Sequence, residues 1–367
     1  MKIVVPEKWM PCDGVVLEDS ANSAVRTNKN TLVIAGPGAG KTELLAQKAS
    51  YLFQTNICRD PQKILAISFK KDAADNLKKR VIKRCGKEIE TRFVSMTYDA
   101  FSKSILDHFR FALPEVLRPD AAYLVNDVDT IDAAFKKAGY NNPLNLPVYK
   151  LRTYYERVLD SVELPFTRND LGETVWKLLL KGFDNYKPTL SFKMMCILAE
   201  FIIKTNYKIK RGLQLTYKYV FLDEFQDTTY LQYKLVKQCF LNSGSIMTAV
   251  GDNKQRIMVW AGALKTVFHD FKTEFNAETH KLTMNHRSAP RLVDLQRKMY
   301  ASLNESDSTI CVSDKWEPDD GMVTLLIAED EENEAATISE HISAQIESGI
   351  EPNKLCILCK QKPQDYA

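Results

Sequence analysis

The octapeptide AGPGAGKT, residues 35–42, constrains this chain more than any other stretch, because it lies between the apolar run TLVI and the helix-forming text ELLAQKASYLF. A strand, a glycine-rich turn and a helix place backbone N–H groups and a helix N-terminus against a polyphosphate. In this pattern Lys41 reaches the β and γ phosphates, and Thr42 offers its hydroxyl to Mg²⁺. A tight structural turn without a ligand is the alternative. The predicted nucleotide-binding residues are Gly36, Pro37, Gly38, Ala39, Gly40, Lys41 and Thr42.

Composition sets only broad limits on the partners of the chain. Lys and Arg total 50 against 47 for Asp and Glu, so the net charge of +3 does not by itself indicate a polyanionic partner. The 8 cysteines have no framework spacing, which is typical of free thiols in a reducing compartment. The N-terminal text does not match a signal peptide, and no run approaches the ~18 apolar residues of a membrane span. We therefore expect a cytoplasmic protein without membrane contact.

Short β-branched runs alternate with amphipathic stretches, which predicts a parallel α/β sheet. The predicted strands are 31–35, 63–69, 92–97, 219–224 and 245–252, and the predicted helices include 41–53, 71–85, 98–109 and 230–241. Between about Leu106 and Tyr207 the text is helical and rich in aromatic residues, which predicts a helical insertion.

The C-terminal text reads as strand, helix and strand at 322–328, 331–349 and 354–360. Such a β-α-β unit begins a domain rather than completing one. Cys356 and Cys359 form a CxxC pair inside the last apolar run, where a place in the core is a better interpretation than a metal site.

A second chemical signal is LDEFQD, residues 222–227, at the end of the apolar run YVFL. Asp223 at a strand tip suits a Mg²⁺ ligand. Glu224 beside it is placed to align and deprotonate a water molecule that attacks the γ phosphate. An acidic strand edge without chemistry is the alternative.

The motif DEFQD closely resembles the second motif of the superfamily 1A DNA helicases of the UvrD and Rep type, and further resemblances follow in order along the chain. SFKKDAADNLKKR (68–80) is similar to a family motif that contacts single-stranded DNA, and MTYDAF (96–101) resembles another, with Asp99 where a His is usual. The resemblance implies DNA contacts at Phe69, Thr97 and Tyr98. Read without the family, Phe69 and Tyr98 are better interpreted as core aromatic residues.

Two later motifs complete the resemblance. AVGDNKQRIMVWAGA (249–263) is similar to the third motif, which implies that Gln255 senses the γ phosphate and that Trp260 stacks on a DNA base. LTMNHRS (282–288) resembles the fourth, which implies that Arg287 acts as an arginine finger. The alternatives are a buried anchor for Trp260 and a surface side chain for Arg287.

The positions that hold adenine in the family depart from its pattern. The resemblance places Ala21, Glu43 and His286 where a Gln, an Arg and a Tyr are usual. We still place Glu43 and His286 in the base-binding part of the site, and we expect a relaxed preference among ATP, GTP and dNTPs. Glu43 could equally be a plain carboxylate at a helix N-terminus. Met258 and Ala261 are further departures, in the third motif.

The family resemblance implies an α/β fold: a RecA-like P-loop NTPase domain formed by 1–105 and 206–284, a helical insertion formed by 106–205, and the start of a second RecA-like domain at 285–367. It implies ATP hydrolysis with Mg²⁺, coupled to single-stranded DNA or DNA with a single-stranded tail and to 3′-to-5′ translocation. The predicted catalytic residues are Lys41, Glu224, Gln255 and Arg287, and the predicted metal ligands are Thr42 and Asp223.

Two other functions stay open from the sequence. One is a nucleotide-switched, DNA-binding ATPase subunit that recruits a nuclease or repair protein without unwinding. The other is an ATPase that acts on RNA or on no nucleic acid. The later motifs of the family are absent from these residues, so we expect the N-terminal portion of a longer protein rather than a complete motor.

Overall fold

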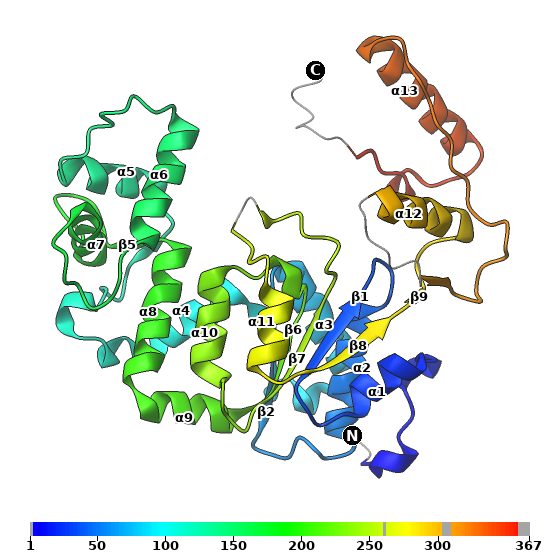
Figure 1. Cartoon of the computed structure of the whole chain (residues 1–367), viewed down its shortest axis with the longest axis horizontal. Coiled ribbons are helices and arrows are strands. Elements are labelled where there is room, and N and C mark those ends of the chain that lie inside the picture. Colours follow the sequence, from blue (N-terminus) through cyan, green and yellow to red (C-terminus); the bar gives the residue numbers. More distant parts are fainter. Residues whose placement is uncertain (1–2, 260–261, 303–309, 359–367) are drawn as a thin grey trace.

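A computed structural model describes residues 3–259, 262–302 and 310–358. Its centre is a six-stranded sheet in the order β3-β2-β6-β7-β1-β8, and every neighbouring pair is parallel (Figure 1). The strands are β1 (Thr31–Ala35), β2 (Lys63–Ser68), β3 (Phe93–Thr97), β6 (Tyr217–Leu222), β7 (Ile246–Gly251) and β8 (Glu278–Leu282). The α/β class predicted from the alternating pattern is therefore present.

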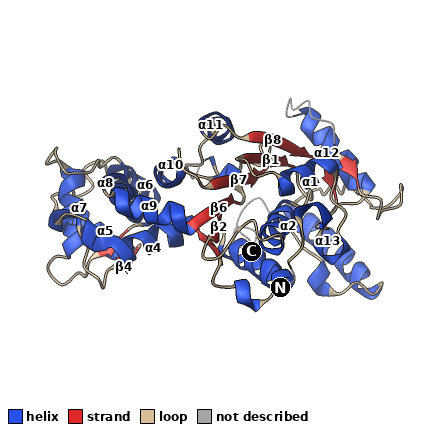
Figure 2. Ribbon diagram, turned by 90° about the horizontal axis from the view of Figure 1, so that it is seen from below, coloured by secondary structure: helices blue, strands red, loops and turns tan. Residues whose placement is uncertain are grey.

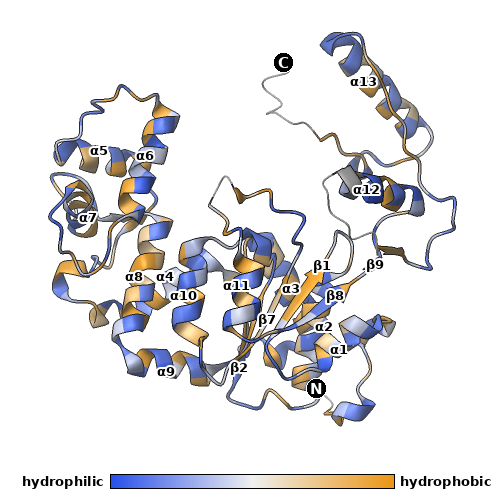
Figure 3. Cartoon of the chain, in the orientation of Figure 1, coloured by the Kyte–Doolittle hydropathy of each residue, from blue (hydrophilic) through white to orange (hydrophobic). Residues whose placement is uncertain are grey.

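The central strands are apolar because helices cover both faces of the sheet. Alternate residues of one strand enter two different cores: Leu32 belongs to the apolar cluster on one face of the sheet, and Val33 belongs to the cluster on the other face. Figure 2 shows the row of strands between these two sets of helices, and Figure 3 shows β1 in the hydrophobic colour. The helices on the face of Leu32 are α4 (Tyr98–Phe109), α8 (Phe192–Thr205), α9 (Tyr207–Thr216), α10 (Tyr230–Phe240) and α11 (Val267–Glu274). The helices on the face of Val33 are α1 (Asp19–Arg26), α2 (Lys41–Gln54) and α3 (Lys71–Cys85).

A helical layer lies beside the sheet, on the left in Figure 1. It contains α5 (Val128–Lys137), α6 (Val148–Asp160), α7 (Leu171–Lys181) and one pair of two-residue strands, β4 (Leu124–Val125) and β5 (Thr189–Leu190). Phe135 and Tyr155 stack in its interior with ring centroids 3.9 Å apart. The apolar core of this layer is continuous, through α4 and α8, with the core on one face of the sheet.

The C-terminal part differs from the sequence-based expectation. It contains β9 (Met284–Asn285), α12 (Pro290–Ser302), β10 (Cys311–Val312) and α13 (Glu331–Glu347). The predicted helix is present, but within the described residues neither 322–328 nor 354–358 forms a strand. A β-strand needs a partner for its backbone groups, and here Leu325 and Ile327 are 83% and 87% exposed.

The cysteines correct one expectation and agree with another. Cys356 is exposed, so the predicted place in the core is wrong for this residue, because the apolar run around it does not pair into a sheet. Cys359 lies outside the described residues. Cys58, Cys85, Cys196 and Cys239 are buried free thiols, as expected. Within the described part of the chain, every helix is too short or too polar to cross a bilayer.

Trp9 offers a test of how the N-terminal segment is held against α2. Its ring is buried against Tyr51, with centroids 5.2 Å apart, and its Nε1 donates to Gln54 Oε1 at 2.7 Å. We expect Trp9→Ala to lower the free energy of unfolding by about 3–5 kcal/mol, because a large buried side chain is lost. Met10→Ala is the control, since Met10 is exposed and its loss should cost under about 0.5 kcal/mol. Urea unfolding of both variants decides; equal effects would contradict the packing described here.

Candidate functional site

The glycine-rich loop joins the carboxyl end of β1 to the N-terminus of α2, and two of its glycines are required by geometry. Gly40 caps α2 with φ +80°, a left-handed conformation that favours glycine. Gly38 has φ +75°, and a Cβ on it would lie 2.2 Å from Asn285 Oδ1. The loop therefore packs directly against the segment that follows β8.

One cavity of about 320 Å³ opens beside this loop. Parallel strands end at the same edge of a sheet, so residues far apart in the sequence meet there. The lining comes from the loop itself, α2, α3, the end of β6, the loop after β7 and the segment after β8. The lining residues are Pro37, Gly38, Ala39, Gly40, Lys41, Thr42, Glu43, Asn76, Arg80, Glu224, Gln255, His286 and Arg287.

Asp223 follows the last residue of β6 and is almost fully buried. Its Oδ1 accepts from the Glu224 N–H at 3.0 Å, whereas its Oδ2 is buried without a hydrogen-bond partner. Burial, and then the charge of Glu224, raises the pKa of Asp223 to about 6. The Glu224 N–H, the charge of Lys41 and the nearby Thr42 hydroxyl act in the opposite direction.

Glu224 adopts a left-handed backbone conformation with φ 47° and ψ 48°. For a residue other than glycine this costs about 1–3 kcal/mol, and such strain is concentrated at functional sites. The turn directs the side chain to the cavity, where Lys41 Nζ lies 4.0 Å from Glu224 Oε2.

His286 and Arg287 reach the cavity through a compact turn after β9. The His286 N–H donates to the Gly38 carbonyl at 2.9 Å, and Asn285 Oδ1 accepts from the N–H groups of Arg287 and Ser288. These bonds hold the Arg287 backbone beside the glycine-rich loop. Gln255 reaches the cavity from the loop that follows β7.

The donor set near Thr42 fits a hard divalent cation. Asp223 Oδ2 is a buried carboxylate oxygen without a partner, and the Thr42 hydroxyl is close enough to Asp223 to affect its pKa. Mg²⁺ binds such oxygen ligands and commonly uses one or two protein groups together with water and substrate phosphates. Thr42 and Asp223 therefore fit Mg²⁺.

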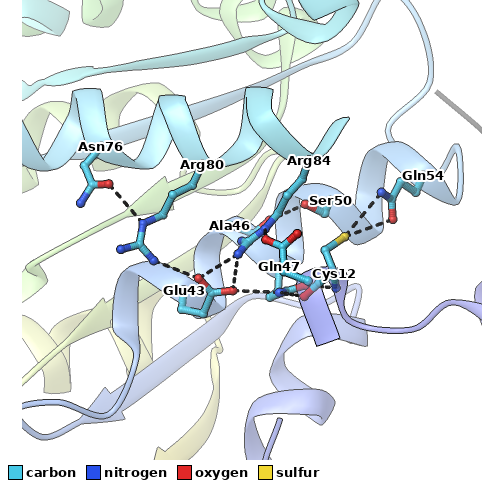
Figure 4. A network of polar contacts seen from close by, with 10 residues as sticks. Cys12, Glu43, Ala46, Gln47, Ser50, Gln54, Asn76, Arg80 and Arg84 are labelled. Atoms are coloured by element: carbon cyan, nitrogen blue, oxygen red, sulfur yellow. Dashed lines mark hydrogen bonds and ion pairs between the residues drawn. The ribbon is translucent and has the colours of Figure 1, made fainter. Parts of the chain in front are cut away.

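Glu43, one of the residues that line the cavity, is the centre of a polar network (Figure 4). Its carboxylate accepts from Arg80 at 2.9 Å, from Arg84 at 2.9 Å and from Gln47 at 2.8 Å. Arg84 is also paired with Asp13 at 2.8 Å. The carboxylate of Glu43 is thus occupied by protein donors. Ala21, which is another of the three departures from the family pattern at the base-binding positions, is buried on α1.

The predicted DNA contacts divide into three groups. Phe69 and Thr97 are half-buried, and Thr97 caps α4 by accepting from the Ala100 N–H at 3.2 Å. The expectation for Tyr98 is corrected: it is only 2% exposed, with its hydroxyl 3.1 Å from the Thr228 hydroxyl, so its ring belongs to the core. Trp260 lies outside the described residues.

Sequence reasoning missed two residues that the structure brings to the edge of the sheet where the cavity opens. Gln226 is buried and donates to Glu224 Oε2 at 2.8 Å, and Asp252 is buried at the end of β7. A polar side chain within an otherwise apolar and acidic turn was the available signal for Gln226. The network around Glu43 was not foreseeable, because it joins residues of α3 to α2 through tertiary contacts.

A parallel sheet with a glycine-rich loop after β1 and an acidic pair after β6 defines a P-loop α/β fold of the RecA-like type. The family model described as "UvrD/REP helicase N-terminal domain" matches residues 17–276. The chain therefore belongs to the UvrD/REP helicase family, as its motifs predicted.

Several relatives support this assignment. The chain is 29% identical over 298 residues to a probable DNA helicase II homolog of Mycoplasma capricolum, covering 76% of this chain and 40% of the relative. It is 26% identical over 343 residues to the ATP-dependent DNA helicase Rep of Buchnera aphidicola, covering 88% and 50%. DNA helicase II of Haemophilus influenzae is 25% identical over 354 residues, covering 91% and 47%. The chain thus spans half or less of the length of these relatives.

The raised pKa of Asp223 predicts that its ionisation lowers the free energy of unfolding as pH rises. The folded-state pKa of about 6 lies above the ordinary value of 3.8, so the folded chain holds the proton more tightly than the unfolded chain. The resulting stability is complete below the unfolded pKa and is lost as pH rises through about 6. Without metal, we expect wild type to lose on the order of 2 kcal/mol relative to Asp223→Asn between about pH 4.5 and pH 7. Urea unfolding of both proteins in EDTA measures this difference; a difference that does not change with pH would contradict it.

Proposed function

We propose that this chain is the ATP-hydrolysing motor portion of a UvrD/Rep-type DNA helicase. The observation that carries the proposal is that Lys41, Glu224, Gln255 and Arg287, from four distant segments, line one cavity. A P-loop with an acidic base and an arginine at the same phosphate is the arrangement that phosphoryl transfer requires.

The roles follow from the positions of the groups. Lys41 and the N–H groups at the start of α2 bind the β and γ phosphates. Glu224 accepts the proton of the attacking water. Arg287 stabilises charge that develops on the phosphate in the transition state, and Gln255 responds to the γ phosphate.

Thr42 and Asp223 would hold Mg²⁺, which would neutralise phosphate charge when bound. Because burial raises the pKa of Asp223 to about 6, a proton would compete with the metal for this carboxylate below about pH 6.

Coupling to single-stranded DNA and 3′-to-5′ translocation come from the family. The DNA path would include Phe69 and Thr97, with Trp260 as a stacking residue. Tyr98 is omitted because it is buried. A nuclease or repair partner belongs to the rival function, in which nucleotide binding switches a DNA-binding subunit without unwinding.

Single-stranded DNA should stimulate ATP hydrolysis by this chain, and Glu224→Gln should remove hydrolysis while it retains nucleotide binding. The amide preserves shape but cannot accept the proton, so we expect kcat to fall by about 10²-fold or more. Steady-state phosphate release measures the loss of hydrolysis, and titration with a fluorescent nucleotide measures the retained binding. Unchanged turnover would reject Glu224 as the base.

The response to DNA separates the rival functions. Displacement of a protein bound ahead on the strand supports the motor. DNA binding without displacement supports the switched subunit. Hydrolysis that is indifferent to DNA supports an ATPase that acts elsewhere.

We expect a relaxed choice of base. The Glu43 carboxylate is occupied by Arg80, Arg84 and Gln47, so it is not available to read a base edge. His286 carries the only aromatic ring among the described residues that line the cavity. The kcat/KM values for ATP, GTP, CTP and dATP should therefore agree within about tenfold, since no dedicated hydrogen bond discriminates among them. Strict use of ATP would refute this expectation.

A further inference from the structure

Gln226 lies in the short turn after Glu224 and is only 4% exposed. Its Nε2 donates to Glu224 Oε2 at 2.8 Å, and its Oε1 accepts from the Asp252 N–H at 3.0 Å. One side-chain amide thus connects the predicted base, at the end of β6, to the backbone at the end of the neighbouring strand β7.

The orientation of this amide is fixed by its two partners. A backbone N–H only donates, so the group that faces Asp252 N must be the carbonyl oxygen. The NH₂ group then has to face Glu224, whose carboxylate oxygen accepts its hydrogen bond. The reverse orientation would set donor against donor and acceptor against acceptor.

Gly251, on the neighbouring strand, lies close to the Gln226 amide. A Cβ on Gly251 would lie 2.6 Å from Gln226 Oε1 and 2.9 Å from Phe268 Cζ. Gly251 is therefore required for space, since even a methyl group would displace the amide. Strand β7 therefore packs directly against Gln226.

Both described contacts of the Glu224 carboxylate fall on the same oxygen. Oε2 accepts from Gln226 and faces Lys41 Nζ at 4.0 Å. Within the described part of the chain, Oε1 is left to accept a proton from water in the cavity. A general base works only when one oxygen is held within hydrogen-bond reach of that water.

We propose that Gln226 is a positioning residue that fixes the rotation of the Glu224 carboxylate and thereby selects Oε1 as the catalytic oxygen. This inference rests on the proposed function, because it assigns the support of the same base. Gln226 itself does not contact the nucleotide, since it is absent from the described lining of the cavity.

The test is Gln226→Glu in the full chain, with kcat and KM of ATP hydrolysis as readouts. The new carboxylate replaces a donor to Glu224 with a like charge, which turns the base away from its position. We expect kcat near neutral pH to fall roughly tenfold or more and KM for ATP to change less than about twofold.

Gln232→Glu is the matched control, because it makes the same chemical change six residues further on. Gln232 Oε1 accepts from the Thr229 N–H in the capping box of α10, and a Glu at this position forms the same bond. Its kinetics should equal those of wild type. Gln226→Asn, which retains the amide but shortens its reach, should lower kcat in the same way, and it decides the matter if Gln226→Glu does not fold.

The outcomes separate the two proposals. Wild type that hydrolyses ATP, with a folded Gln226→Glu that matches it in kcat, overturns the inference alone. A rise of KM without a fall of kcat also overturns it, because that would indicate a role in binding. Absence of hydrolysis in wild type removes the proposed function and this inference with it.

Discussion

The parallel pairing of β1 with both β7 and β8 is the constraint on which the site depends. Thr31 is in register with Thr248 on one side and with Glu278 on the other. The three strands therefore deliver their following loops to one edge. The glycine-rich loop, the Gln255 loop and the Arg287 turn become neighbours although they are far apart along the chain. This pairing brings the Arg287 turn close to Gly38. A side chain at Gly38 would separate that turn from the glycine-rich loop.

The sequence predicted the parts whose signal is local. The runs at 31–35, 63–69 and 245–252 are apolar because they are buried on both faces, and β1, β2 and β7 form there. The glycine-rich loop and the acidic pair also carry their own chemistry. The strand β8 is different: its text, ETHKL, is largely polar because it lies at the edge of the sheet, so composition alone could not reveal it.

Other features depended on tertiary contacts that no short pattern encodes. Tyr98 occupies a position whose family motif suggests an exposed contact, yet α4 turns its ring into the core. The apolar run at 322–328 has the composition of a strand, but it has no neighbour to pair with in the described residues. Gln226 shows the same limit within the site, since its importance comes from the distance between β6 and β7 rather than from its neighbours in sequence.

The continuous core described for the helical layer has a mechanical consequence. Leu190 and Trp176 of that layer belong to the same apolar cluster as Val220 and Leu222 of β6, with α4 and α8 between them. A rotation of the layer against the sheet would have to open close-packed contacts, which resist deformation. A displacement of the far helices would therefore also move β6, whose last residue, Leu222, directly precedes Asp223 and Glu224.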